Sequence, residues 1–175
     1  MAGQVHDAQA LLRVCLEQGG YALYIGEDQE RGKRWMGRHD TRTRSQQDKW
    51  KDEFTHGKVT RHITAWDADL GRVYTTLYDQ TIDYGGHPNE RGTTVNMTME
   101  EIEDGWRRFN TVYLHGDGLF LDFALKTTAQ VGICALRLAK VIYPLRVQAT
   151  GVEFQLETIS KRFKCYRGAS DGQSR

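Results

Sequence analysis

The sequence predicts a mainly α-helical fold, a bundle of four to five helices with a β-hairpin inserted at about residues 93–115. Before and after this insertion, apolar residues recur three and four positions apart, which is the spacing of one helix face. Within it, Met97 and Met99 alternate with polar residues, which is the spacing of a strand. The dipeptide Asp104-Gly105 follows, and it is typical of a two-residue hairpin turn.

Length and composition favour one soluble domain. A chain of 175 residues with a net charge of +1 predicts a single domain over residues 1–167, and the small polar residues 168–175 predict a disordered tail. The near-neutral charge creates no global attraction to nucleic acid or membrane. Three scattered cysteines and no visible secretory signal indicate free thiols and a cytoplasmic location.

The first helix is expected over Val5–Asp28, with apolar residues on more than one side. Arg13 and Glu17 lie one turn apart within it. A charged pair in so apolar a helix needs partners, so we expect the two side chains to satisfy each other or a third group. They form either a partly exposed pair or a pair that faces the cluster of Asp79, Asp83 and His87.

Residues 30–51 are basic and contain an aromatic residue, which is the composition of a phosphate-contacting loop. A solvated, mobile loop has the same composition, and both interpretations stay open. Gly32 and Gly37 are expected to break any helix in this segment. The candidate nucleic-acid-binding residues are Arg34, Trp35, Arg38 and Arg42.

A short helix at 47–56 and a second long helix at Lys58–Tyr84 are expected next. Gly71 interrupts the apolar spacing and is expected to allow close packing of a neighbour. Gly85-Gly86 and Pro88 then predict a left-handed C-cap and a stiff turn.

This central turn carries the densest run of reactive side chains. Asp79, Asp83 and His87 are spaced by four, and we expect His87 to project just past the helix end, where nearby carboxylates favour its charged form. His87 with Arg91 offers a proton shuttle and a cation for RNA cleavage without metal. The alternative is a capped helix end with structural hydrogen bonds. The candidate catalytic residues are Arg13, Glu17, Asp83, His87 and Arg91.

A two-residue turn at Asp104-Gly105 would pair Met97 with Val112 and Glu101 with Arg108. Because an isolated hairpin is marginally stable, we expect it to lie against the helices. The competing interpretation is a helix that begins with a capping box at Thr98. We prefer the hairpin, since Asp-Gly is unfavourable within a helix.

The third long helix is expected over Leu119–Tyr143, capped by Asp117. Its charged residues would be costly in a bilayer, so we interpret it as a buried core helix and expect no membrane contact. Pro144 ends it, and a capping box at Thr150 opens a last helix. No cofactor motif is present, and the sparse histidines lack metal-ligand spacing, so neither a cofactor nor a metal is expected.

Residues 5–92 resemble bacterial all-helical proteins of the HEPN-like and abortive-infection type. The resemblance lies in the Arg/Glu pair on the first long helix and in the His-Pro-Asn turn that follows the second long helix. The resemblance implies a helical bundle and a metal-independent, defence-associated ribonuclease. The family motif places an Arg four to six residues before a His. Here Arg91 follows His87, whereas Arg34 with His39 and Arg108 with His115 fit the spacing away from a long helix end.

Two functional hypotheses follow, and the sequence leaves open whether the protein is an enzyme. The first is a bacterial RNA-binding or RNA-cleaving domain with its site around the His-Pro-Asn turn. The second is a non-catalytic helical scaffold or protein-interaction module, in which the same residues form a structural polar network. RNA and a second copy of the chain are the expected partners.

Overall fold

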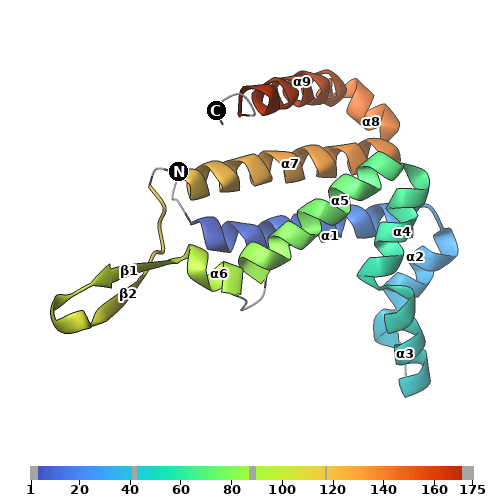
Figure 1. The fold of residues 1–175 in the computed structure, drawn as a ribbon. Helices are drawn as coiled ribbons and strands as arrows, with labels where there is room; N and C mark the ends of the chain where they lie inside the picture. Colours follow the sequence, from blue (N-terminus) through green and yellow to red (C-terminus); the bar gives the residue numbers. More distant parts are fainter. Residues whose placement is uncertain (1–3, 41–42, 87–89, 117, 171–175) are drawn as a thin grey trace.

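The computed structural model describes residues 4–40, 43–86, 90–116 and 118–170, with only the backbone described at 86, 104 and 162–170. Helices and one two-stranded antiparallel hairpin make up the fold, which confirms the predicted fold class (Figure 1). The helices are α1 (Val5–Gly26), α2 (Gln29–Met36), α3 (Arg44–Glu53), α4 (His56–Trp66), α5 (Ala68–Thr81), α6 (Glu90–Val95), α7 (Leu119–Ile142), α8 (Pro144–Ala149) and α9 (Val152–Ser170).

The core forms where α1, α5 and α7 pack side by side (Figure 1). Helix α1 contributes Leu16 and Leu23, both almost fully buried. The prediction that α1 is buried on more than one side holds in part. Tyr21 and Ile25 pack against the core beside the buried stripe, whereas Leu11 and Val14 are exposed. The principal core residues of the bundle are Leu16, Leu23, Ile63, Tyr74, Leu77, Val131 and Leu138.

The predicted helix over Lys58–Tyr84 is in fact two helices, α4 and α5, that meet at Asp67. The Asp67 carboxylate accepts hydrogen bonds from the backbone N–H groups of Asp69 and Leu70, both at 2.9 Å, and so caps the start of α5. Close packing at Gly71 is confirmed. A Cβ there would lie 2.6 Å from the Cα of Thr64 on α4.

The described residues of the basic segment form a helical arm (residues 28–40 and 43–54) and not a loop (Figure 1). Gly32 lies inside α2, so the prediction that it breaks a helix was wrong, whereas Gly37 follows the end of α2 and begins a 3-10 helix, Gly37–Asp40. Tilted aromatic rings in contact hold α2 against α3, with 5.2 Å between the ring centroids of Trp35 and Trp50. Aromatic burial thus orders this segment despite its charge.

The hairpin pairs β1 (Met97–Glu101) with β2 (Arg107–Thr111). Its register differs by one residue from the prediction, since Met97 lies opposite Thr111. The reason is a five-residue connection over 102–106 that contains a 3-10 turn, in place of a two-residue turn. The expectation that the hairpin lies against the helices was also wrong, because it projects from the bundle (Figure 1).

Helix α7 buries one face only, contrary to the prediction of a buried helix. Leu119 is 79% exposed and Leu125 39%, while Val131 and Leu138 are fully buried. Leu119–Ile142 is long and apolar enough to span a membrane by length and composition, a criterion that core helices also meet, and 22% of its most apolar window is buried.

The end of the chain follows the predicted long helices with three differences. Helix α8 was not predicted, α9 extends into the predicted tail that begins at residue 168, and the cap differs. Pro144 ends α7 and begins α8, and α9 extends to Ser170. The predicted capping box at Thr150 does not form. Its hydroxyl donates to the Arg146 carbonyl, 2.9 Å away, and Glu153 pairs with Lys140. Asp117, the predicted cap of α7, lies outside the described residues.

Candidate functional site

The Arg13–Glu17 pair belongs to a half-buried polar network between α1 and α5. Arg13 Nε donates to Glu17 Oε1 at 3.0 Å, and the Tyr78 hydroxyl donates to the same oxygen at 3.0 Å. The Arg13 guanidinium also lies 5.3 Å from the centroid of the Tyr78 ring. The structure confirms a partly exposed pair whose third group is a tyrosine, whereas no described contact joins the pair to Asp79 or Asp83.

His56, from the start of α4, extends this network by stacking on Tyr78, with 3.5 Å between the ring centroids. Burial lowers the pKa of His56, although the negative charges of Glu17 and Asp79 oppose the shift. Burial also raises the pKa of Tyr78, and its hydrogen bond to Glu17 adds to the increase. The network therefore holds a neutral imidazole and a neutral phenol beside an ion pair.

The remaining predicted catalytic residues are placed differently. Asp83 lies in a π-helical turn, Ile82–Gly86, that follows α5. Its carboxylate accepts from Arg91 at 2.6 Å in an exposed ion pair. Arg91 thus meets Asp83 as part of the predicted site, whereas no described contact joins either residue to Arg13 or Glu17. His87 lies outside the described residues.

The central turn packs directly on α1 through Gly85. A Cβ at Gly85 would lie 2.3 Å from the Cβ of Gln9 and 2.9 Å from the carbonyl oxygen of His6. The backbone of Gly85 is not left-handed, so the predicted left-handed C-cap does not form at this residue. Gly85 is needed here because only a residue without a side chain fits against α1.

A cavity of about 550 Å³ lies beside this turn, at the root of the hairpin. Asn96 is its central polar group. Its amide nitrogen lies 3.2 Å from His6 Nδ1 and donates to the Gly92 carbonyl at 2.8 Å, and its amide oxygen lies 3.2 Å from His115 Nε2. The residues that line the cavity include His6, Asp7, Gly85, Asn96, Thr111 and Tyr113.

This bonding pattern fixes the tautomers of two histidines. Because the Asn96 amide nitrogen can only donate, His6 accepts at Nδ1, and because the amide oxygen can only accept, His115 donates from Nε2. The assignment follows from the hydrogen-bond network. The bonds tie α1 to both ends of the hairpin, and the Val112 N–H adds a bond of 2.7 Å to the Asn96 carbonyl.

No group of three or more metal-ligating side chains comes together within the described ranges. The cavity instead offers the His6 imidazole and the Asp7 carboxylate, which can form hydrogen bonds with a ligand. The sequence pattern did not reveal His6 or Asn96, because the two residues are far apart in the sequence and come into contact only in the folded chain. His56 and Tyr78 were missed for the same reason, although Tyr78 lies one residue before the predicted Asp79–His87 series.

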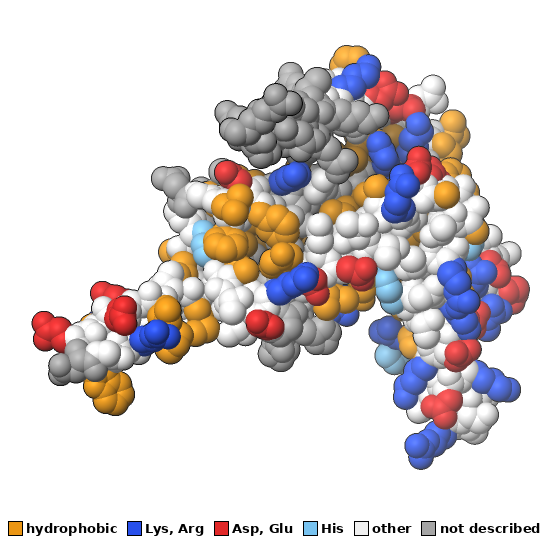
Figure 2. Space-filling model, in the orientation of Figure 1, with side chains coloured by type: hydrophobic (Ala, Val, Ile, Leu, Met, Phe, Trp, Pro, Cys, Tyr) orange, Lys and Arg blue, Asp and Glu red, His pale blue; other side chains and the backbone are white. Residues whose placement is uncertain are grey.

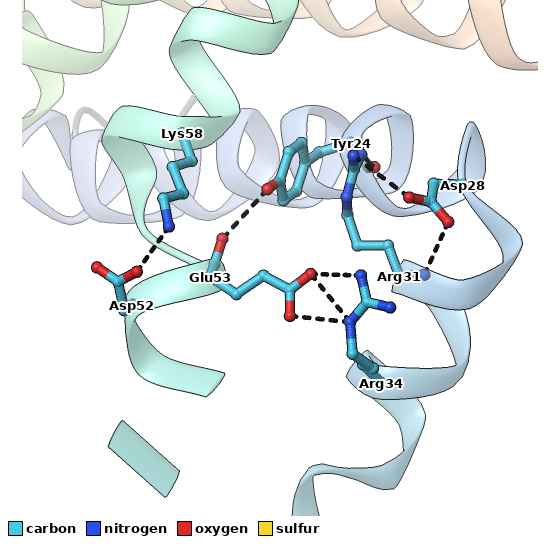
Figure 3. Close-up of polar contacts among 7 residues, drawn as sticks. All are labelled: Tyr24, Asp28, Arg31, Arg34, Asp52, Glu53 and Lys58. Atoms are coloured by element: carbon cyan, nitrogen blue, oxygen red, sulfur yellow. Dashed lines mark hydrogen bonds and ion pairs between the residues drawn. The ribbon is translucent and has the colours of Figure 1, made fainter. Parts of the chain in front are cut away.

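The candidate nucleic-acid-binding residues lie on the arm. Arg34 forms a bidentate ion pair with Glu53, with the shortest N–O distance at 2.6 Å (Figure 3). The half-buried Trp35 ring, on α2 of the arm, packs against Tyr21 of α1, and the Arg38 guanidinium lies 5.6 Å from its centroid. Arg42 lies outside the described residues.

No protein-family model, curated protein or solved structure matches this chain. The resemblance to HEPN-like proteins therefore stays a prediction.

Proposed function

We propose that this protein is a non-catalytic helical scaffold that self-associates through its β-hairpin. The observation that carries the proposal is the hairpin itself, which projects from the bundle with large apolar side chains in solvent (Figures 1 and 2). Phe109 is 62% exposed and Met99 58%. Isolated hairpins are marginally stable, so an unpacked one gains from a partner that covers its apolar face.

The two faces of the hairpin differ in character. Residues directly opposite each other point to the same face, and alternate pairs point to opposite faces. One face presents Met97 and the Met99/Phe109 pair, with Glu101 opposite Arg107 near the tip. The other face presents the pairs Thr98/Asn110 and Glu100/Arg108. The first, apolar face is the docking surface in this proposal.

Charge complementarity selects a second copy of the chain as the occupant. A twofold axis along the hairpin, between two stacked apolar faces, places β1 of one copy over β2 of the other. Met99 then faces Phe109 of the second copy, and Glu101 faces Arg107 of the second copy, because each pair lies at the same level along the strands. A closed twofold interface needs this kind of self-complementary surface.

The root of the hairpin supports this role. The bonds of Asn96 to His6 and His115 hold the hairpin on α1, so less conformational freedom is lost on association. The face is smaller than a standard protein interface, and we therefore expect a dimer that dissociates on dilution.

The described contacts of the predicted catalytic residues fit a structural role. Arg13 and Glu17 bind each other and Tyr78, and Asp83 binds Arg91. RNA cleavage by the site around His87 stays a prediction, and a scaffold explains these contacts without it.

Sedimentation velocity over a range of micromolar concentrations tests the proposal. The wild type should show a monomer–dimer equilibrium. Glu101→Arg should shift it toward the monomer, because two arginines would face each other across the interface, and Glu101→Arg combined with Arg107→Glu should restore the dimer. Glu100→Arg is the matched control, with the same charge change on the opposite face, and it should leave the equilibrium unchanged.

A wild type that stays monomeric at every concentration would refute the proposal. Equal dissociation by Glu101→Arg and Glu100→Arg would also refute it, since the interface would then not involve the apolar face. Circular dichroism of each variant would confirm that the helical bundle remains folded.

A further inference from the structure

The helical arm contains a second pocket, between the 3-10 helix that follows α2 and the face of α3. It has a volume of about 410 Å³ and is lined by Arg38, His39, Gln47, Trp50 and Lys51. None of the described residues that line it carries a carboxylate. Figure 2 shows basic side chains over this arm, at the lower right of the molecule.

At other positions on the arm and at its junction with α4, four basic side chains form ion pairs with carboxylates. The ion pairs are Lys33–Glu30 and, drawn in Figure 3, Arg31–Asp28, Arg34–Glu53 and Lys58–Asp52. Lys51 differs, since its exposed ammonium makes no ion pair with any described residue. Lys51 therefore brings to the pocket a positive charge that no described carboxylate neutralises.

The hydrogen bond between Arg38 and His39 leaves the other imidazole nitrogen of His39 as a further donor. Arg38 Nε donates to His39 Nε2 at 2.9 Å. A guanidinium can only donate, so His39 accepts at Nε2 and, as a neutral imidazole, carries its proton on Nδ1. The pocket thus combines a planar guanidinium, a flexible ammonium, an imidazole N–H and the Gln47 amide, which are donors suited to an oxyanion.

The aromatic cluster beneath the pocket keeps its walls in place. Trp50 packs on Trp35 with 5.2 Å between ring centroids and on Phe54 with 5.0 Å. The Tyr21 hydroxyl donates to the Phe54 carbonyl at 2.7 Å and fixes the end of α3 to α1. The backbone positions of Arg38 and Lys51, on separate elements, therefore lie at one pocket before any ligand arrives, which lowers the entropy cost of binding.

We propose that this pocket binds a phosphate group, with Arg38, His39 and Lys51 as its ligands and Trp50 as its aromatic wall. The phosphate is either free inorganic phosphate or part of a single-stranded RNA backbone, in which case a neighbouring base can lie on the aromatic wall. This site is independent of the hairpin, so its failure would leave the proposed scaffold role untouched.

The test is a titration of ¹⁵N-labelled protein, followed through the indole N–H signal of Trp50, which Trp50→Phe assigns. Inorganic phosphate is one probe, and a short single-stranded oligouridylate is the other. Each probe is also titrated with sodium chloride matched for ionic strength. Lys51→Gln should weaken binding roughly tenfold, the value expected for loss of one charge-assisted hydrogen bond.

Lys33→Gln is the matched control, because it removes the same charge from an exposed ion pair on the arm that does not line the pocket. It should leave the affinity within a factor of about two. A saturable shift with both probes supports a site for which the phosphate group suffices, and a shift with the oligouridylate alone supports a nucleic acid backbone as its source. The absence of a shift with either probe, or equal weakening by Lys33→Gln and Lys51→Gln, would overturn the proposal.

Discussion

Replacement of Gly71 by alanine tests how closely α4 and α5 pack. The new Cβ would lie 2.2 Å from Thr64 Oγ1 and 2.6 Å from Thr64 Cα, whereas ordinary contacts of this kind lie at 3.4–4 Å. The second contact is with the backbone, so a rotamer change of Thr64 cannot remove it. The two helices have to separate by roughly 1 Å, which weakens the packing of the buried side chains around them.

Two opposing effects set the magnitude. Overpacking of a well-packed interface costs up to about 3 kcal/mol, and alanine gains about 1 kcal/mol over glycine in a helix. We therefore expect Gly71→Ala to lower the free energy of unfolding by about 2 kcal/mol. Urea denaturation followed by far-ultraviolet circular dichroism measures this change.

Gly132→Ala is the matched control, since Gly132 lies inside α7 with no atom within 4 Å of the new Cβ. The Gly132→Ala variant should have a free energy of unfolding higher by up to about 1 kcal/mol, through helix propensity alone. Thr64→Ala should not rescue Gly71→Ala, because the Cα of residue 64 remains. A Gly71→Ala variant as stable as the wild type would refute this account of the α4–α5 contact.

Three further predictions concern the polar network and the core. Burial lowers the pKa of His56 below its ordinary 6.5 in the folded state, so the unfolded state takes up the proton first and stability should fall as the pH drops below about 6.5. Urea denaturation at several pH values should show a smaller fall in stability for His56→Phe than for the wild type, and an unchanged fall for the control His39→Phe. Equal falls in the two variants would contradict the assignment to His56. Tyr78→Phe removes the hydrogen bond to the half-buried Glu17 and should lower the free energy of unfolding by about 1 kcal/mol. An unchanged free energy of unfolding would contradict a stabilising role for this bond. Burial raises the pKa of the Cys134 thiol to about 12, so alkylation mapped by mass spectrometry should modify the exposed Cys15 in the native protein and Cys134 only after unfolding; native modification of both at similar rates would contradict the packing.

Periodicity predicted the fold class and the positions of α1, α7 and α9, because amphipathic spacing reports which face a helix buries. It did not predict the break at Asp67. The apolar spacing there continues through a residue whose carboxylate caps a new helix. The start of α3 had a local signal that was overlooked, since Thr43 and Gln46 form a capping box.

The site was less predictable than the fold. The spacing of Arg13 and Glu17 indicated a satisfied pair, and the structure confirms their bond. Their tyrosine and histidine partners come from α5 and α4, and long-range contacts of this kind leave no trace in local spacing. The hairpin shows the same limit, because the 3-10 turn at its tip shifts the register by one residue and so changes which side chains share a face.

An isotope-filtered nuclear Overhauser experiment tests the central claim most directly. Protein labelled with ¹³C at methionine methyl groups is mixed with unlabelled protein at a concentration where the dimer forms. The scaffold proposal predicts an intermolecular signal between the Met99 methyl group of one copy and the Phe109 ring of the other, and this signal should disappear in Glu101→Arg. A dimer without that signal, or a chain that shows no intermolecular signal at any concentration, would contradict it.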